Sequence, residues 1–251
     1  MQPLVDTADA GLSYLDNVLS QTADASGIVP KTCTRILFVT KLNRSATMTN
    51  LDSYFKTYFT ETEADATGIV VVLPSSMWAL LECSPESITG ILRRMQQEIT
   101  SSSSSSNTKS TVTSLGIQDG RVVGVTEDCP HRLFDQLYCT SSNPAAENIP
   151  DLETENPTTL STTLYRSIIT FGYQLMDNQH TSPQVLRNID IIGKAMSEPQ
   201  SYNLPSDERC QAIATLSKLM TIQEWLQAYD ATLSIDPTIE MVYPLPQRTV
   251  Y

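Results

Sequence analysis

The sequence predicts an α+β fold in which two helices cover one face of a mixed or mainly antiparallel sheet, followed by a helical extension. Three observations predict it. Between residues 34 and 140 the apolar segments follow the order β-α-β-β-α-β-β. The apolar residues after residue 158 recur with helical spacing, and a polar, acidic stretch at 141–157 separates the two regions as a linker. This split β-α-β order (βαββαββ) is typical of a ferredoxin-like fold, which carries both helices on one side of its sheet.

The first elements are predicted to be a helix, a strand and a second helix. Residues 1–33 contain leucines at helical spacing over 5–20 and then a linker with Gly27 and Pro30. A short apolar run, Ile36 to Val39, indicates a buried strand. One apolar face over 47–60 predicts the next helix; it contains Met48, Leu51, Phe55, Tyr58 and Phe59.

A β-hairpin is predicted next. Gly68 to Leu73 is a continuous β-branched run, which indicates a strand buried on both faces. Pro74-Ser75-Ser76 forms a turn, and Met77 to Glu82 returns as the second strand. Trp78 in that strand is expected to be a core or interface aromatic, with a stacking platform for a ring as the alternative.

The second half of the sheet is interrupted by a serine-rich loop. Ser84-Pro85 is a helix start, because serine caps the helix and proline suits its first position. A loop at 100–111 contains six consecutive serines and is expected to be extended or disordered, with a phosphorylation cluster as the alternative. Arg121–Glu127 and Leu133–Tyr138 are predicted to be the last strands.

Residues 158–251 are predicted to be four helices and a proline-containing tail. The helices are expected over 159–177, after Ser182-Pro183, after Ser206, and from Thr221 to Tyr229. The last has a capping-box pattern, with Thr221 followed three residues later by Glu224. The prolines of the tail favour extended backbone.

Charge excludes several classes of partner. The chain has 16 Lys and Arg against 28 Asp and Glu, a net charge of −12. Nucleic-acid backbones and anionic lipids bind clustered basic residues, so neither is an expected partner. No stretch approaches the roughly 20 apolar residues of a membrane span. The first 20 residues lack a secretory signal, so we expect a soluble, intracellular protein.

No catalytic or metal constellation is visible in the sequence. Five scattered cysteines form no Cys-x-x-Cys pair and are interpreted as buried, reduced thiols. With only His131 and His180, a zinc site is not expected. The nine glycines form neither a phosphate loop nor a nucleophile elbow. The sequence therefore predicts a protein that is not an enzyme.

Three segments carry a resemblance to BLUF domains, the flavin-binding blue-light sensors with a ferredoxin-like fold. They are Arg35 to Thr40, Ala66 to Val70, and Ala79 to Glu82. By this resemblance, the residues that contact the flavin in BLUF domains are replaced in this chain. The family's tyrosine aligns with Phe38, its glutamine with Ala79, and its asparagine near Glu61. Its tryptophan and methionine align near Leu137 and Cys139. Because these polar contacts are absent, we expect a retained fold with a degenerate flavin site and no cofactor.

A broader resemblance covers about 220 residues. The chain is similar to the testis-expressed protein 47 family, BLUF-like proteins of animal sperm. Its basis is Ile36–Lys41, Thr67-Gly68, Leu81–Ser84, His131–Phe134 and the ending from Thr221 to Pro246. The resemblance implies a protein of the axoneme of motile cilia or flagella, and leaves the complex open among radial spoke, central apparatus and doublet-associated assemblies.

We therefore expect a non-catalytic structural or adaptor protein. Its BLUF-like domain would serve as an interaction scaffold, contact with the acidic microtubule surface would be indirect because of the −12 charge, and self-pairing stays open. Alternatives are a sensor of flavin or another small molecule, with a pocket lined by Phe38, Val70 and Leu80, and, least favoured, an enzyme. Because exposed aromatics anchor interfaces, the interface candidates are Trp225, Tyr229, Tyr243, Leu245 and Tyr251. For Trp225 and Tyr229, a position in the core is equally compatible with the sequence.

Overall fold

A computed structural model of the chain describes residues 32–104, 115–143, 156–181 and 188–230. For residues 101–104 and 177–181 it describes the backbone alone. The predicted helix at 5–20, the helix start at Ser182-Pro183 and the proline-containing tail lie outside the described residues.

A five-stranded mixed sheet forms the centre of the molecule, in the order β4-β1-β3-β2-β5. Strand β1 is antiparallel to both β3 and β4, and β2 is antiparallel to β3, which gives the ferredoxin-like arrangement of four strands. Strand β5 adds to β2 in parallel and makes the sheet mixed. The α+β, ferredoxin-like fold is thus confirmed. The strands are β1 (Cys33–Leu42), β2 (Thr67–Val72), β3 (Ser76–Cys83), β4 (Ile117–Cys129) and β5 (Leu137–Ser141).

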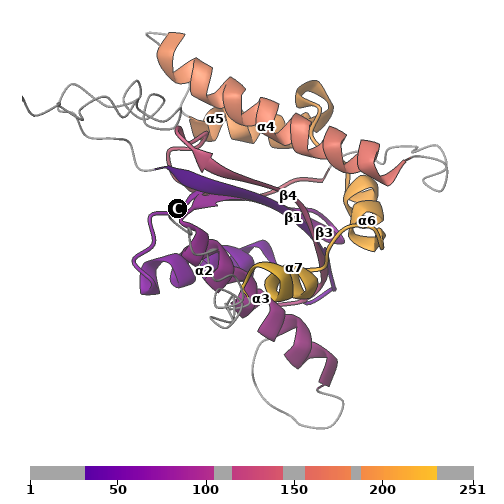
Figure 1. Cartoon of the computed structure of the whole chain (residues 1–251). Helices are drawn as coiled ribbons and strands as arrows, with labels where there is room; N and C mark the ends of the chain where they lie inside the picture. The colour runs from indigo at the N-terminus through magenta and orange to yellow at the C-terminus, as the bar shows by residue number, and fades with distance from the viewer. Residues whose placement is uncertain (1–31, 105–114, 144–155, 182–187, 231–251) are drawn as a thin grey trace, which may run out of the picture.

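Helices cover both faces of this sheet (Figure 1). The helices α2 (Met48–Glu61) and α3 (Pro85–Ser104) lie on one face, together with α7 (Ile222–Tyr229). The opposite face is covered by the rest of the C-terminal helices, which are α4 (Pro157–Thr181), α5 (Asn188–Ser197), η1 (Pro199–Tyr202) and α6 (Asp207–Thr215).

Two hydrophobic cores result, because successive strand residues point to opposite faces. Ile36 and Phe38 face α2 and α3, whereas Leu37 and Val39 face α4 and α6. The residues of β2 from Ile69 to Val72 are divided in the same way, and each is nearly or fully buried. Burial of this strand on both faces, as its continuous apolar run indicated, is confirmed.

Side-chain caps fix the helix starts that the sequence indicated. Thr47 accepts a hydrogen bond from the backbone N–H of Asn50, and Ser206 accepts one from Arg209. Ser84 Oγ accepts from the N–H of Ser87 at the start of α3. At α7 the capping box is complete in both directions between Thr221 and Glu224.

Two sequence expectations are wrong in part. Leu133 and Phe134 lie in a loop and β5 begins only at Leu137, because the backbone N–H groups of the first two residues bind a buried carboxylate. Helix α3 continues to Ser104, so the first four of the six serines are helical, which their modest helix propensity allows. Within the described residues, no helix is both long and apolar enough to cross a bilayer.

Candidate functional site

The positions that the BLUF resemblance aligns with flavin contacts lie mostly in one line across the sheet. Phe38 of β1 is paired with Ala79 of β3, which is paired with Val70, and Val70 is paired with Cys139 of β5. All four pack with the core beneath α2 and α3. The structure therefore brings Phe38, Ala79 and Cys139 together on one face, where both Phe38 and Ala79 are fully buried.

The other positions border this line. Leu137 begins β5 and is half-buried against the same core. Glu61 is the last residue of α2 and is exposed, with its carboxylate 3.0 Å from Nη1 of Arg94. The sequence placed Leu80 in the same pocket wall as Phe38 and Val70, and this is wrong. Leu80 faces α4 and α6, because it is the strand neighbour of Ala79.

The chemistry available along this line is limited. Phe38, Val70 and Ala79 have no hydrogen-bonding side-chain atom. Burial raises the pKa of the Cys139 thiol from 9.0 to about 12, with the neighbouring Asp52 adding to the shift. The line therefore presents an apolar wall and one neutral thiol at neutral pH.

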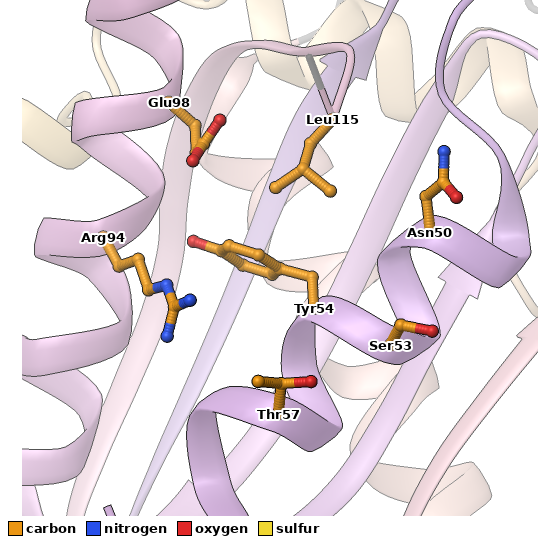
Figure 2. Close-up of a pocket in the computed structure, with 7 residues that line it drawn as sticks. All are labelled: Asn50, Ser53, Tyr54, Thr57, Arg94, Glu98 and Leu115. Carbon is orange, nitrogen blue, oxygen red and sulfur yellow. The ribbon is translucent and has the colours of Figure 1, made fainter. Parts of the chain in front are cut away.

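A cleft of about 320 Å³ lies between the same two helices (Figure 2). The ring of Tyr54 crosses it, and only 8% of Tyr54 is exposed. The Tyr54 hydroxyl has no hydrogen-bond partner. The guanidinium carbon of Arg94 lies 5.4 Å from the centroid of the Tyr54 ring and 5.8 Å from that of Tyr58. The lining residues are Asn50, Ser53, Tyr54, Thr57, Arg94, Glu98 and Leu115.

The electrostatics of the cleft keep the Tyr54 hydroxyl neutral. Burial is the main cause that raises its pKa well above the usual range, and the carboxylate of Glu98 adds to this. The guanidinium of Arg94 acts in the opposite direction. A neutral phenol can both donate and accept a hydrogen bond. The Tyr54 hydroxyl is therefore an unused donor and an unused acceptor in the cleft.

A second cluster surrounds Glu82, whose side chain is fully buried in β3. Its carboxylate lies 2.6 Å from Nε of Arg35 and 3.0 Å from the Thr67 hydroxyl, which donates to it. The backbone N–H of Leu133 donates to it at 2.9 Å, and that of Phe134 at 3.2 Å. The buried charge is thus both paired and fully hydrogen-bonded, as buried charges must be to be tolerated.

Two arginines extend this network to the loop after β4. The guanidinium of Arg35 also donates to the carbonyl of His131. Arg132 donates to Asp65 at 2.9 and 3.0 Å and to the Thr67 hydroxyl at 3.3 Å. Gly68 follows with φ of +138°, and an added Cβ would lie 2.1 Å from the carbonyl oxygen of Leu80. The segments that carry the sequence resemblance therefore meet at one end of the sheet.

The candidate interface residues divide between core and surface. Trp225 of α7 is 8% exposed and packs in the core under α3. Tyr229 stacks on it with ring centroids 5.0 Å apart, and is 64% exposed. Arg93 of α3 binds Asp230 through Nε at 2.6 Å and through a second N–H. Tyr243, Leu245 and Tyr251 lie outside the described residues.

A family model for testis-expressed protein 47 matches residues 32–231. The chain belongs to the testis-expressed protein 47 family. The matched range begins next to β1 and includes α7, so both helical layers belong to the part that this family member shares with the others. No curated protein matches the chain.

Several solved structures are similar to this family member at low identity. A bacterial light-regulated adenylyl cyclase has 10% identity and a TM-score of 0.33, and the match covers 66% of this chain and 40% of that one. The BLUF domain of BlrP1 has 12% identity and a TM-score of 0.32, over 70% and 97% of the two chains. A Klebsiella pneumoniae BlrP1 complex with calcium and cyclic di-GMP has 8% identity, a TM-score of 0.32, and coverage of 53% and 34%. This chain thus spans less than half of the first and third of these proteins.

Among the described residues, no three His, Cys, Asp or Glu side chains are grouped so as to hold an ion. His131 contributes its carbonyl to the Glu82 network. The sequence missed the cleft because Tyr54 falls on the same helical face as the core residues Leu51 and Phe55.

Proposed function

We propose that the protein is a non-catalytic structural or adaptor component of the axoneme of a motile cilium or flagellum. Membership of the testis-expressed protein 47 family supports a sperm context. The single observation that carries an adaptor role is the firmly held helix α7, which presents an exposed tyrosine next to its buried anchor Trp225. Axonemal location and partners are parts of this proposal.

Helix α7 is well suited to hold an interface residue in place. Its capping box fixes one end and the Arg93–Asp230 pair fixes the other. Just before it, the backbone N–H of Val122 in β4 donates to the carbonyl of Met220. A side chain presented from an ordered element loses little conformational freedom on binding, so more of the contact energy contributes to affinity.

The exposed apolar surface of α7 is the proposed contact. Tyr229, the last residue of α7, is 64% exposed, and Met220, two residues before the start of the helix, is 45% exposed. Tyrosine is enriched among the residues that dominate binding energy at protein interfaces. With a net charge of −12, the chain favours a partner with a basic surface, and any hold on the acidic microtubule is expected to be indirect.

The proposal is tested by fractionation of flagella that carry a tagged chain. We expect the chain to stay with the axoneme after mild detergent and to leave at high salt. Cross-linking should then capture partners that Tyr229→Ser loses. Tyr173→Ser is a matched control, because Tyr173 is an exposed tyrosine of α4 in the other helical layer. Release by detergent alone would contradict the axonemal part of the proposal.

The alternative of a flavin sensor stays a prediction from sequence. A purified sample with the absorption spectrum of bound flavin would favour it, since Phe38 and Ala79 form the wall against which such a ring would pack. Replacing Ala79 by a bulkier residue should then abolish the spectrum.

A further inference from the structure

We propose that the cleft between α2 and α3 binds a small zwitterion of about dipeptide size, with its opposite charges about 6 Å apart. The inference does not depend on the axonemal proposal. Three observations carry it: the unpartnered hydroxyl of Tyr54, the pair of opposite charges beside it, and the volume of the cleft.

The Tyr54 hydroxyl is a polar group placed for a ligand. It is buried and unpartnered, although buried hydroxyls are normally hydrogen-bonded. Figure 2 shows it pointing across the cleft toward the α3 side chains Arg94 and Glu98. By contrast, the hydroxyl of nearby Tyr58 donates to the carbonyl of Ser87. A bound molecule in the cleft would give Tyr54 the partner that the protein itself does not supply.

Arg94 and Glu98 determine the charge pattern of the ligand. They lie four residues apart on α3, which is about 6 Å along a helix axis, and both side chains flank Tyr54 in Figure 2. Glu61 binds the guanidinium of Arg94 through Nη1, and the planar fork has further N–H donors that suit a carboxylate. Glu98 suits an ammonium group. The lining carries one positive and one negative side chain, so it favours neither a phosphate nor a simple cation.

The rest of the lining fits a short peptide-like molecule. Asn50, Ser53 and Thr57 supply amide and hydroxyl groups along α2, and Leu115 supplies an apolar side. A volume of about 320 Å³ is at the lower end of ligand pockets, which suits a dipeptide with one aliphatic side chain.

The test is calorimetric titration of the full-length protein with the dipeptide alanyl-leucine. We expect saturable binding that weakens at least tenfold when the carboxylate is amidated, and likewise when the amine is acetylated. The absence of saturable binding, or equal binding of all three compounds, overturns the proposal.

Variants locate the binding and separate it from stability. Tyr54→Phe removes one oxygen atom and should weaken binding severalfold, with an unchanged or higher melting temperature because an unpartnered hydroxyl is lost. Tyr173→Phe makes the same change outside the cleft and should leave the affinity unaltered. Arg94→Gln should abolish the preference for the free carboxylate over its amide, whereas Glu61→Gln should keep it. If Tyr54→Phe binds as well as the natural protein, the dipeptide does not bind in this cleft and the proposal fails.

Discussion

The guanidinium Nε of Arg35 lies 2.6 Å from a carboxylate oxygen of Glu82, and both side chains are more than 90% buried. Through this pair, strands β1 and β3 are joined to the loop after β4, because Glu82 also binds the backbone of Leu133 and Phe134. A buried pair of this kind mainly specifies which segments meet. Its removal is costly because the remaining charge is left without a partner.

Glu82→Gln should therefore lower the free energy of unfolding by about 3–5 kcal/mol, since Arg35 keeps a buried charge without its counterion. Urea denaturation measures the change. Glu61→Gln is the control, because the Glu61–Arg94 pair is exposed and such pairs contribute less than about 1 kcal/mol. Equal effects of the two substitutions would contradict the role assigned to burial.

Gly68→Ala should destabilise the protein by more than about 2 kcal/mol, because the backbone has φ of +138° and the new Cβ would meet the Leu80 carbonyl oxygen at 2.1 Å. Gly193→Ala is a matched change in helix α5, where nothing lies within 4 Å of the added atom. It should be neutral or stabilise by up to about 1 kcal/mol. Thermal melting of both variants decides this.

Stability should fall at alkaline pH. Burial raises the pKa of Cys33 from 9.0 to about 11 and that of Cys83 to about 12. Well below pH 9 these thiols are protonated in both the folded and the unfolded chain, so their contribution is fully present. Between pH 9 and about 12 the unfolded chain releases protons that the folded chain retains, and the free energy of unfolding decreases.

Urea midpoints from pH 8 to pH 11 measure this dependence. Cys83→Ala should show a shallower fall than the natural chain, because one of the shifted thiols is gone. A midpoint that stays constant over this range would show that the thiols ionise as readily in the fold as outside it.

The stacked aromatic pair of α7 should divide between stability and binding. Trp225→Ala should cost about 3–5 kcal/mol, as expected for a large core side chain that is 8% exposed. Tyr229→Ala should cost less than about 1.5 kcal/mol, the energy of the ring stacking, because the residue is mostly exposed. Guanidinium denaturation separates the two, and a larger loss for Tyr229 would place it in the core.

Much of the fold could be predicted because strand and helix periods are local properties. The continuous apolar run of β2 correctly indicated burial on both faces, and the capping box at Thr221 and Glu224 fixed the start of α7. Leu133 and Phe134 were misassigned to a strand, because they are apolar and adjacent to the strand residues Leu137 and Tyr138. In the structure they are as buried as strand residues. Their burial depends on a hydrogen bond to Glu82, about 50 residues away, which no local pattern records.

The candidate site was harder to predict for a similar reason. Tyr54 has the spacing of a core residue, and only its hydroxyl shows that it borders a cleft. Arg93 binds Asp230 at the end of α7, and Arg94 lies over two tyrosine rings. Both contacts join segments that are distant in sequence, so no local pattern indicates them.

The coverage of both sheet faces has a consequence for synthesis of the protein on the ribosome. The strands are complete at Ser141, whereas the helices that cover Leu37, Val39 and Leu80 end only at Thr215. At cellular rates of translation, synthesis of the residues from the end of β5 to the end of α6 takes on the order of several seconds, and this apolar face stays uncovered during that time. A nascent chain of this family is therefore expected to need a chaperone during that interval, and slower translation would lengthen its dependence.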